Sequence, residues 1–182
     1  EQLNGSNNNL TLKFSSAEVD AYGGEIDVEY GSISLDEGTN LKLKSAFSAL
    51  DIDEVSSLVV NSQYDALDID NIGSLDIEAK FTTAEIDKLG QSLDAKMGYG
   101  GIEIDEISKD FTIIDIDAQF GGVELDFEDG ASYTLQASSQ MGDVDVPSSM
   151  KISKESDEML SKSIEGTMGD SPGDRKVIIK VS

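Results

Sequence analysis

Hydrophobic and polar residues alternate along this chain in short runs that recur at regular intervals. Each run ends at an aromatic residue, which we call the anchor, and Met141 takes this place in the last run. An aliphatic residue stands four positions before each anchor, and an uncharged, mostly small residue stands two positions before it. This period-2 alternation predicts β-strands with one buried face. The anchors are Phe14, Tyr30, Phe47, Tyr64, Phe81, Tyr99, Phe120 and Met141.

The phase of the alternation changes after each anchor. Two small or turn-forming residues follow, as in Gly31-Ser32 and Gly121-Gly122, and apolar residues resume three and five positions after the anchor. We interpret the two inserted residues as a corner that re-aims the strand. Before the corner, every second residue faces inward, and the anchor falls on one of these inward positions. We therefore expect the aromatic column to lie in the core. Tyr22 and Tyr133 stand outside this column and could be partly exposed.

Each repeat thus predicts a strand, a corner, a second strand and a second corner. A single pair of strands cannot bury its apolar side, whereas stacked repeats bury a continuous core. We therefore predict an all-β, single-stranded β-helix, or solenoid, of about eight coils with 16 to 21 residues each. The general preference for right-handed crossovers makes a right-handed coil the expectation. The alternative is an antiparallel sandwich or barrel of evenly spaced hairpins.

The pattern divides the single domain into solenoid repeats, residues 1–147, and a tail, residues 148–182. Residues 1–9 are polar and rich in asparagine, which indicates a lead-in. Pro147 ends the last clear coil, because proline cannot donate a hydrogen bond to a strand ladder. We expect residues 148–174 to form a long exposed loop with a short helical turn near residues 158–163. The alternating residues 177–181 predict a terminal strand that caps the stack or belongs to an unfinished coil.

Acidic residues occupy the outward positions of the strand that follows each corner. Most repeats read acid-apolar-acid there, as in Asp51-Ile52-Asp53. Stacked in register, these residues form two parallel rows of carboxylates on one face. Like charges on neighbouring strands repel, and aspartate is depleted in strands, so counter-ions should offset part of the repulsion. Carboxylate oxygens suit hard cations such as Ca²⁺, and the candidate metal-binding residues are Asp51, Asp53, Asp68, Asp70, Glu85, Asp87, Glu103, Asp105, Glu124 and Asp126.

A simpler hypothesis is that the carboxylate rows only keep a flat β-surface soluble and prevent lateral aggregation. The sequence contains no EF-hand loop and no glycine-rich nonapeptide calcium motif. We therefore expect no cofactor, and binding of Ca²⁺ is a hypothesis that rests on the rows alone.

The composition excludes several classes of function. The 182 residues include 13 Lys and Arg against 37 Asp and Glu, which gives a net charge of −24 and argues against nucleic acid as a partner. The chain has no histidine and no cysteine, so it cannot form a Ser-His-Asp triad, a histidine-ligated zinc site, a disulfide or a thiol nucleophile. We predict no catalytic residues. No run of apolar residues is long enough to span a membrane as a helix.

The repeat resembles the adhesin families of bacterial envelope proteins, which are solenoid domains of unknown function, common in Bacteroidetes and related to the heads of autotransporter adhesins. The resemblance covers residues 8–147. It implies a single-stranded β-helix, export to the periplasm or the cell surface, and an adhesive role, and it supplies no catalytic residues. The segments that carry it are Tyr30-Gly31-Ser32-Ile33-Ser34-Leu35, Phe120-Gly121-Gly122-Val123-Glu124-Leu125 and Met141-Gly142-Asp143-Val144-Asp145-Val146.

We therefore expect a non-enzymatic, extracytoplasmic solenoid that acts as an adhesion or structural module and whose acidic face can bind cations. Its partner would be a surface, a glycan or a protein. The alternative is a polysaccharide-active β-helix enzyme, either a lyase or a glycosidase, that uses a pair of acids as its two carboxylates. A uniform column does not resemble one catalytic site, and the single arginine, Arg175, stands in the tail.

Overall fold

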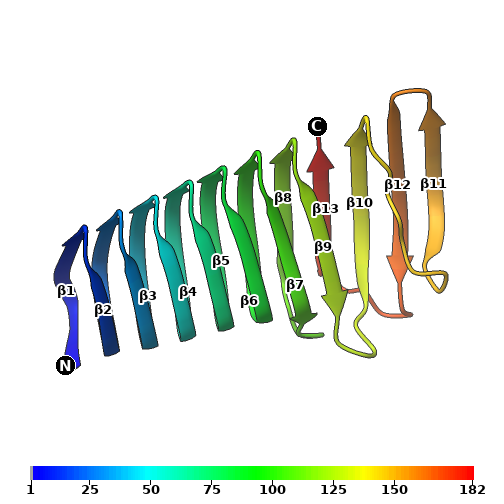
Figure 1. The fold of residues 1–182 in the computed structure, drawn as a ribbon. Coiled ribbons are helices and arrows are strands. Elements are labelled where there is room, and N and C mark those ends of the chain that lie inside the picture. The colour runs from blue at the N-terminus through cyan, green and yellow to red at the C-terminus, as the bar shows by residue number, and fades with distance from the viewer. Residues whose placement is uncertain (1) are drawn as a thin grey trace.

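The computed structural model describes residues 2–182, and their side chains from residue 8 onward; residue 1 of the predicted repeat region lies outside the described residues. The described chain is all-β, without a helix, and forms a β-solenoid of about seven turns (Figure 1), which confirms the predicted fold class. Its strands are β1 (Gln2–Lys13), β2 (Ser16–Glu29), β3 (Ser32–Ala46), β4 (Ala49–Gln63), β5 (Ala66–Lys80), β6 (Thr83–Gly98), β7 (Gly101–Ile107), β8 (Ile113–Gln119), β9 (Gly122–Phe127), β10 (Tyr133–Gln140), β11 (Lys151–Glu158), β12 (Ser161–Met168) and β13 (Lys176–Val181).

Each regular coil is one long strand that bends in the middle. In β3, Ile33 and Leu35 are buried before the bend, and Leu41 and Leu43 are buried after it. Asn40 lies at this bend with a φ of 50°, a left-handed conformation that asparagine tolerates better than most residues. The two halves of each strand belong to two different layers. We call the halves that follow the anchors, together with β7 and β9, the acid layer, and the halves that precede the anchors, together with β8, β10, β11, β12 and β13, the mixed layer.

Successive coils pair in parallel, with the predicted columns in register. Leu35 pairs with Ile52, and Ile52 pairs with Ile69, in the acid layer. Leu43 and Val60 are the corresponding partners in the mixed layer. The continuous core predicted for stacked repeats is therefore present. It extends into the second corner, where the apolar residues eight positions after the anchors are buried, namely Val55, Ile72, Leu89 and Ile107.

Tyr22 and Tyr133 belong to this core, and their expected partial exposure is wrong. Each side chain is 3% exposed. Tyr22 stands eight positions after Phe14, in the column that fills the second corner. Tyr133 packs against Phe111 and Phe127 with ring centroids 5.8 and 4.4 Å apart, and burial raises the pKa of its hydroxyl to about 12.

The tail also differs from its prediction. Instead of a long loop with a helical turn, β11 and β12 form an antiparallel hairpin that extends the mixed layer beyond β10. Met159 and Leu160 form the tip of this hairpin and are exposed. The side chains of β11 are exposed on both of its faces, so its sequence has no alternation of apolar and polar residues from which to predict a strand.

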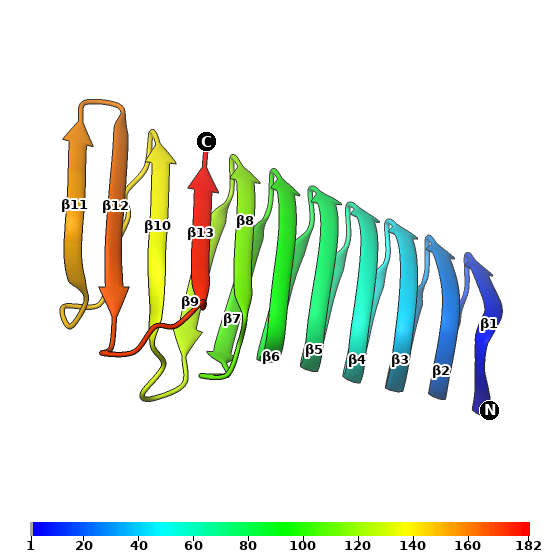
Figure 2. The same ribbon diagram turned by 180° about the vertical axis from the view of Figure 1, so that it is seen from behind.

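The predicted terminal strand exists as β13, but it neither caps the stack nor ends it. β13 is inserted between β8 and β10 and runs parallel to both (Figure 2). Val177 pairs with Ile114, and Ile179 pairs with Ile116, as in a regular coil. As a result, β10 lies one strand further from β8 than the repeat predicts.

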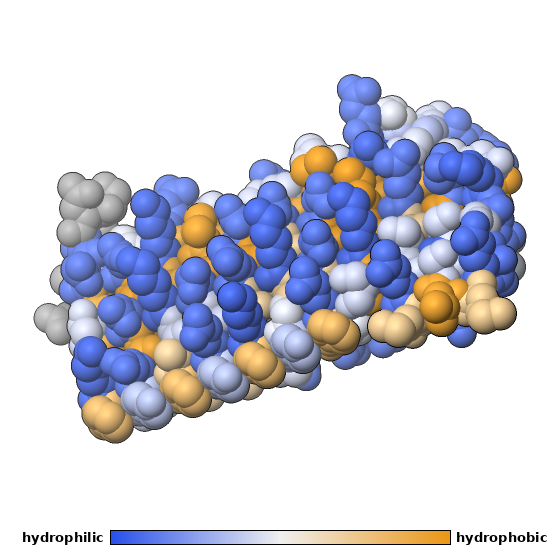
Figure 3. All heavy atoms as spheres, turned by 90° about the horizontal axis from the view of Figure 1, so that it is seen from above, coloured by the Kyte–Doolittle hydropathy of each residue, from blue (hydrophilic) through white to orange (hydrophobic). Residues whose placement is uncertain are grey.

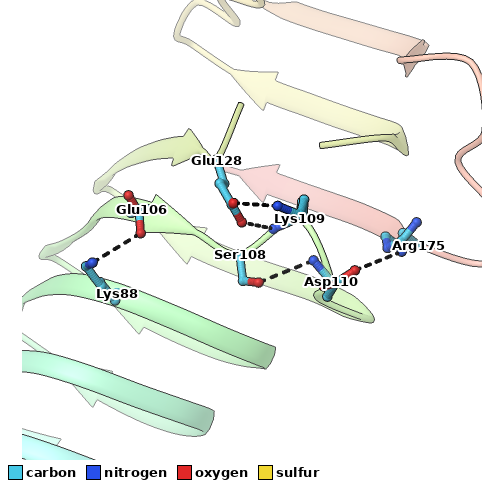
Figure 4. Close-up of polar contacts among 7 residues, drawn as sticks. All are labelled: Lys88, Glu106, Ser108, Lys109, Asp110, Glu128 and Arg175. Carbon is cyan, nitrogen blue, oxygen red and sulfur yellow. Dashed lines mark hydrogen bonds and ion pairs between the residues drawn. The ribbon is translucent and has the colours of Figure 1, made fainter. Parts of the chain in front are cut away.

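Polar contacts connect the start of β13 with the corner that follows β7 (Figure 4). The guanidinium of Arg175 donates to Asp110 Oδ1 over 3.4 Å. Lys109 Nζ donates to Glu128 Oε1 over 2.8 Å, and the Lys109 N–H donates to the second oxygen of the same carboxylate. These contacts join three segments that are far apart in the sequence, and they hold the C-terminal strand next to the coil into which it inserts.

Candidate functional site

The acid layer presents both predicted rows of carboxylates to solvent. In the first row, Asp51, Asp68, Glu85, Glu103 and Glu124 are successive cross-strand partners. The second row lies two residues further along each strand, and both rows alternate with buried side chains. The structure thus brings all ten candidate residues together on one face, with Asp53, Asp70, Asp87, Asp105 and Asp126 in the second row.

The charges in these rows act on one another. The pKa of Glu103 is raised, chiefly by the negative charge of Glu124. The pKa of Asp68 is raised by burial first and then by the charges of Asp51 and Glu85. Among the residues that the structure describes, none of the ten carboxylates has a lysine or arginine within 4.0 Å. The two carboxylate rows therefore carry uncompensated negative charge. Elsewhere in the acid layer, Lys88 Nζ lies 3.4 Å from Glu106 Oε1.

The mixed layer is different, because lysines stand opposite acids on its neighbouring strands. Lys44 Nζ lies 2.6 Å from Glu25 Oε1, and Lys13 Nζ lies 2.7 Å from Glu29 Oε2. These ion pairs join neighbouring strands, and the Lys44 ammonium lowers the pKa of the Glu25 carboxyl. The two faces of the solenoid thus differ in electrostatic character.

The carboxylate rows do not form a ready-made metal cage. Within the described part of the chain, no group of three or more aspartate, glutamate, histidine or cysteine side chains is arranged to hold a metal ion. The rows follow the strand spacing of about 4.8 Å on a flat sheet and do not converge on one point. This geometry suits a layer of cations along the rows, and binding of Ca²⁺ to these residues stays a prediction.

The aromatic anchors form a stacked ladder on the outside of the molecule, so their predicted place in the core is wrong. From Phe14 to Phe120, neighbouring ring centroids are 4.7–5.1 Å apart, with interplanar angles of 0–17°. The exposed fraction of these side chains ranges from 45% for Phe81 to 79% for Phe14. Figure 3 shows the row along one long edge of the molecule, where orange and pale blue side chains alternate as Phe and Tyr do.

The backbone at the corner explains this outward position. Every anchor from Phe14 to Met141 has a φ between 50° and 60°, in the left-handed region that side chains other than glycine rarely adopt. One residue in this conformation interrupts the period-2 alternation. The anchor then points outward, and the next residue points inward, as the burial of Ser48, Asp65 and Thr82 shows. The predicted corner is therefore confirmed, with the opposite orientation of its aromatic residue.

The ladder exposes ring edges more than ring faces. Each inner ring is covered on both faces by its neighbours, as Tyr64 is by Phe47 and Phe81. Cations bind aromatic rings over their faces, so the inner rings cannot bind a cation in this way. The ladder stabilises the corners instead, and the N–H of each anchor from Phe14 to Tyr99 also donates to the neighbouring coil, for example from Tyr64 to the Lys80 carbonyl over 2.9 Å.

A buried carboxylate beneath the ladder was not singled out by the sequence. Asp65 is 7% exposed and accepts hydrogen bonds from the hydroxyls of Ser45 and Ser62, both over 2.6 Å. The N–H groups of Ser48 and Gln63 donate to the same carboxylate over 2.7 and 3.1 Å. Asp65 follows an anchor and therefore resembles a turn residue. The available signal was the group of hydroxyl residues at inward positions of the adjacent coils.

A shallow groove lies between the ladder and the first carboxylate row. It has a volume of about 740 Å³ and extends from β2 to β6. Small residues two positions after the anchors line it, and the acids of the first row border it. A second groove of about 280 Å³ continues along β6, β7 and β9 to Glu124. Carboxylates therefore border a concave strip along much of the acid layer, and the small residues that line the first groove are Ser16, Ser32, Ala49, Ala66 and Thr83.

Comparison with known proteins gives one match. A family model with the description Toastrack DUF4097 matches residues 3–181. No curated protein and no solved structure matches the chain. Among the described residues, no helix has the length and the apolar character needed to cross a membrane.

Proposed function

The chain belongs to the Toastrack DUF4097 family, here a β-solenoid domain of unknown function, and we propose that it acts as a non-enzymatic adhesion or structural module. The proposal includes export to the periplasm or the cell surface of a bacterium. The resemblance of the repeats to envelope adhesins supports this location, and the absence of cysteine and histidine supports a role without nucleophilic or imidazole chemistry.

One observation carries the functional part of the proposal, namely the two in-register rows of exposed carboxylates on the acid layer. We propose that this layer binds cations, Ca²⁺ included, and a cationic or calcium-bridged surface. A rigid array of equivalent groups makes many weak contacts at once, and their combined affinity exceeds that of any single contact. The partner can be a protein or a glycan surface that supplies positive charge or shares the calcium ions.

The electrostatics of the rows supports cation binding. Two carboxylates about 5 Å apart in water repel by roughly 0.8 kcal/mol. This repulsion recurs between neighbouring coils. It is the chief cause of the raised pKa of Glu103, and after burial it also contributes to the raised pKa of Asp68. A cation that lies between two carboxylates removes the repulsion. Because the unfolded chain does not hold the carboxylates in rows, cation binding should stabilise the folded protein.

Thermal unfolding in different salts tests this proposal. We expect CaCl₂ to raise the melting temperature by several degrees more than NaCl at the same ionic strength. The triple variant Asp51→Asn, Asp68→Asn, Glu85→Gln should reduce this calcium-specific increment. Equal melting temperatures in both salts would overturn cation binding by the acid layer.

A matched control is available in the mixed layer. Asp27, Glu78 and Asp117 each have a lysine as a cross-strand partner and are not part of a carboxylate row. The triple variant Asp27→Asn, Glu78→Gln, Asp117→Asn removes the same amount of charge and should leave the calcium increment intact. Binding of the wild-type protein and of both variants to amine-coated and uncoated beads, with and without Ca²⁺, then measures recognition of a cationic surface directly.

A further inference from the structure

The edge of β9 that faces away from β7 carries no strand among the described residues. β9 pairs with β7 alone, whereas the neighbouring acid-layer strand β7 pairs with both β6 and β9. An unpaired edge inside a solenoid is unusual, because each coil normally hydrogen-bonds to the coils on both sides of it.

The insertion of β13 is the cause of this open edge. In the regular coils, the chain runs along a strand of the mixed layer, turns at the anchor and continues as the next strand of the acid layer. Beside β8, the next place in the mixed layer is occupied by β13, and the Phe120 N–H donates to the Ser182 carbonyl over 2.7 Å. β10 is displaced by one strand, so residues 143–147, which follow its anchor Met141, lie one strand further from β9 than in a regular coil.

The apolar side chains around this edge are only partly buried. Val123 and Leu125 of β9 are partly exposed, whereas their partners on β7, Ile102 and Ile104, are 3% and 0% exposed. Ile179 and Val181 of β13 are also partly exposed, whereas their partners on β8, Ile116 and Ala118, are fully buried. The partly buried residues that surround the open edge are Val123, Leu125, Val144, Val146, Ile179 and Val181.

At Val123 and Leu125, the backbone groups of β9 also point toward the open edge. The Gly122 N–H donates to the Gly100 carbonyl over 3.2 Å, on the β7 side, and the Glu128 N–H donates to the Ile107 carbonyl on that side. The backbone groups of successive residues in a strand point to opposite sides. The N–H and C=O groups of Val123 and Leu125 therefore face the open edge.

We propose that this edge of β9 binds an extended peptide segment by strand addition, and that the segment has aliphatic residues at alternate positions with lysine or arginine between them. The aliphatic side chains would cover the partly buried residues around the edge. The residues between them would lie beside Glu124 and Asp126, the last members of the two carboxylate rows, where positive charge is favoured and a further acid is repelled. This inference goes beyond the proposed function, because it concerns one backbone edge and not the acid layer as a whole.

The edge of β11 is a weaker candidate for the same interaction. β11 also ends a sheet, but its side chains are exposed on both faces and are mostly polar. A strand added there would bury little apolar surface. It carries two lysines and three acids, and both lysines already pair with carboxylates, so this edge lacks the uncompensated acidic rows that select a basic peptide at β9.

Two fluorescent peptides test the proposal with the full chain. Both have valine and isoleucine at alternate positions, and the residues between them are lysine in one peptide and glutamate in the other. We expect the lysine peptide to bind at least five-fold more tightly in fluorescence anisotropy at low salt. It should also slow hydrogen exchange at the amides of Val123 and Leu125, and a proline at its centre should abolish both effects.

Charge-reversal variants make the test specific to β9. Glu124→Lys together with Asp126→Lys should reverse the preference in favour of the glutamate peptide. Asp51→Lys together with Asp53→Lys changes the same two rows far from this edge and should leave the preference unchanged. Circular dichroism establishes that both variants are folded, since all four side chains are exposed.

Three outcomes would overturn the proposal. The first is equal binding of both peptides, and the second is protection of β11 without protection of Val123 and Leu125. The third is concentration-dependent protection of these two amides without peptide, which would show that a second copy of the chain occupies the edge. The calcium experiment on the acid layer is independent of all three outcomes.

Discussion

Asp65 shows at the scale of one residue how the corners of this solenoid are stabilised. The position after the anchor points inward, and neighbouring coils place Ser48 and Thr82 there. A buried carboxylate needs hydrogen-bond donors, because removal from water disfavours its charge. Hydroxyls and backbone N–H groups of this corner and the preceding one provide them.

We predict that Asp65→Ala lowers the free energy of unfolding by about 3 kcal/mol, because it leaves several buried donors without an acceptor. Asp65→Ser is the matched variant, since serine occupies the same position in the preceding coil, and it should cost about 1 kcal/mol. Urea unfolding of the three proteins measures the difference. Equal losses for both variants would contradict the assigned role of the carboxylate.

The glycines after Phe120 provide a second comparison of single residues. A Cβ atom at Gly121 would lie 2.0 Å from the Gly100 carbonyl oxygen, whereas a Cβ atom at Gly122 would have no atom within 4 Å. We predict that Gly121→Ala destabilises the protein by about 1–3 kcal/mol, because backbone must move. Gly122→Ala should change stability by less than about 0.5 kcal/mol. Thermal unfolding of both variants checks this, and similar melting temperatures would contradict it.

At the scale of elements, each corner combines an unfavourable backbone with a favourable side-chain stack. The left-handed conformation of a non-glycine residue costs roughly 1–2 kcal/mol. Offset contacts between stacked rings contribute about 0.5–1.5 kcal/mol per pair beyond the burial of their surface. An inner anchor such as Tyr64 has two such contacts, so the stack can offset the backbone conformation that creates it.

This balance predicts an unusual order of stabilities at Tyr64. Tyr64→Ala should destabilise the protein by about 2 kcal/mol, because two ring contacts are lost while the strained φ of 59° remains. Tyr64→Gly should be about 1 kcal/mol less destabilising than Tyr64→Ala, since glycine adopts this φ without strain. Tyr64→Phe should be nearly neutral. Guanidinium unfolding gives the order, and a glycine variant less stable than the alanine variant would refute the explanation.

The elements were predictable where neighbouring residues alone determine them. Strands, corners and the register of the columns follow from alternation and from the repeat length, as Leu35, Ile52 and Ile69 show. The β11–β12 hairpin was not predictable, because it forms at the end of a sheet where few side chains are buried. There the backbone hydrogen bonds of an available edge, and not an apolar pattern, determine the structure.

At the scale of the whole molecule, the net charge of −24 is distributed unevenly over the two faces. The acid layer concentrates like charges, while the mixed layer pairs acids with lysines. Folding therefore raises the pKa of some carboxyls and lowers that of others. Glu103 and Asp68 belong to the first group, and Glu25 and Glu128 belong to the second.

These opposite shifts predict an optimum of stability at mildly acidic pH. A carboxyl with a raised pKa binds its proton more readily in the folded state, so it opposes folding above its folded pKa, and this cost is relieved as the pH falls through that value toward the ordinary carboxyl pKa. A carboxyl with a lowered pKa acts in the opposite sense, and its contribution is lost as the pH falls through its folded value. We expect the melting temperature to be higher at about pH 5 than at pH 7, and to fall below about pH 4.

The variant Asp68→Asn, Glu103→Gln should reduce the gain between pH 7 and about pH 5. Asp27→Asn with Asp117→Asn, which removes two mixed-layer charges that lie opposite lysines, serves as the control. Differential scanning calorimetry at several pH values provides the measurement. A melting temperature that falls steadily from pH 7 downward would show that the carboxylate rows do not oppose folding.

The sequence by itself determined the coil, its columns and the rows of carboxylates, because alternation, corners and repeat length are local properties that every coil expresses in the same way. Only the tertiary structure decided whether each anchor points inward or outward. A single residue in the left-handed conformation reverses the alternation of inward and outward side chains, and the order of apolar and polar residues does not reveal this reversal. The donors to Asp65 also depend on the three-dimensional structure, since Ser45 and Ser48 belong to the preceding corner. The place of β13 also depends on the tertiary structure, because its alternation of apolar and polar residues fits the mixed layer at any coil. The ion pair of Arg175 and the pairing of β13 with β8 and β10 select one position.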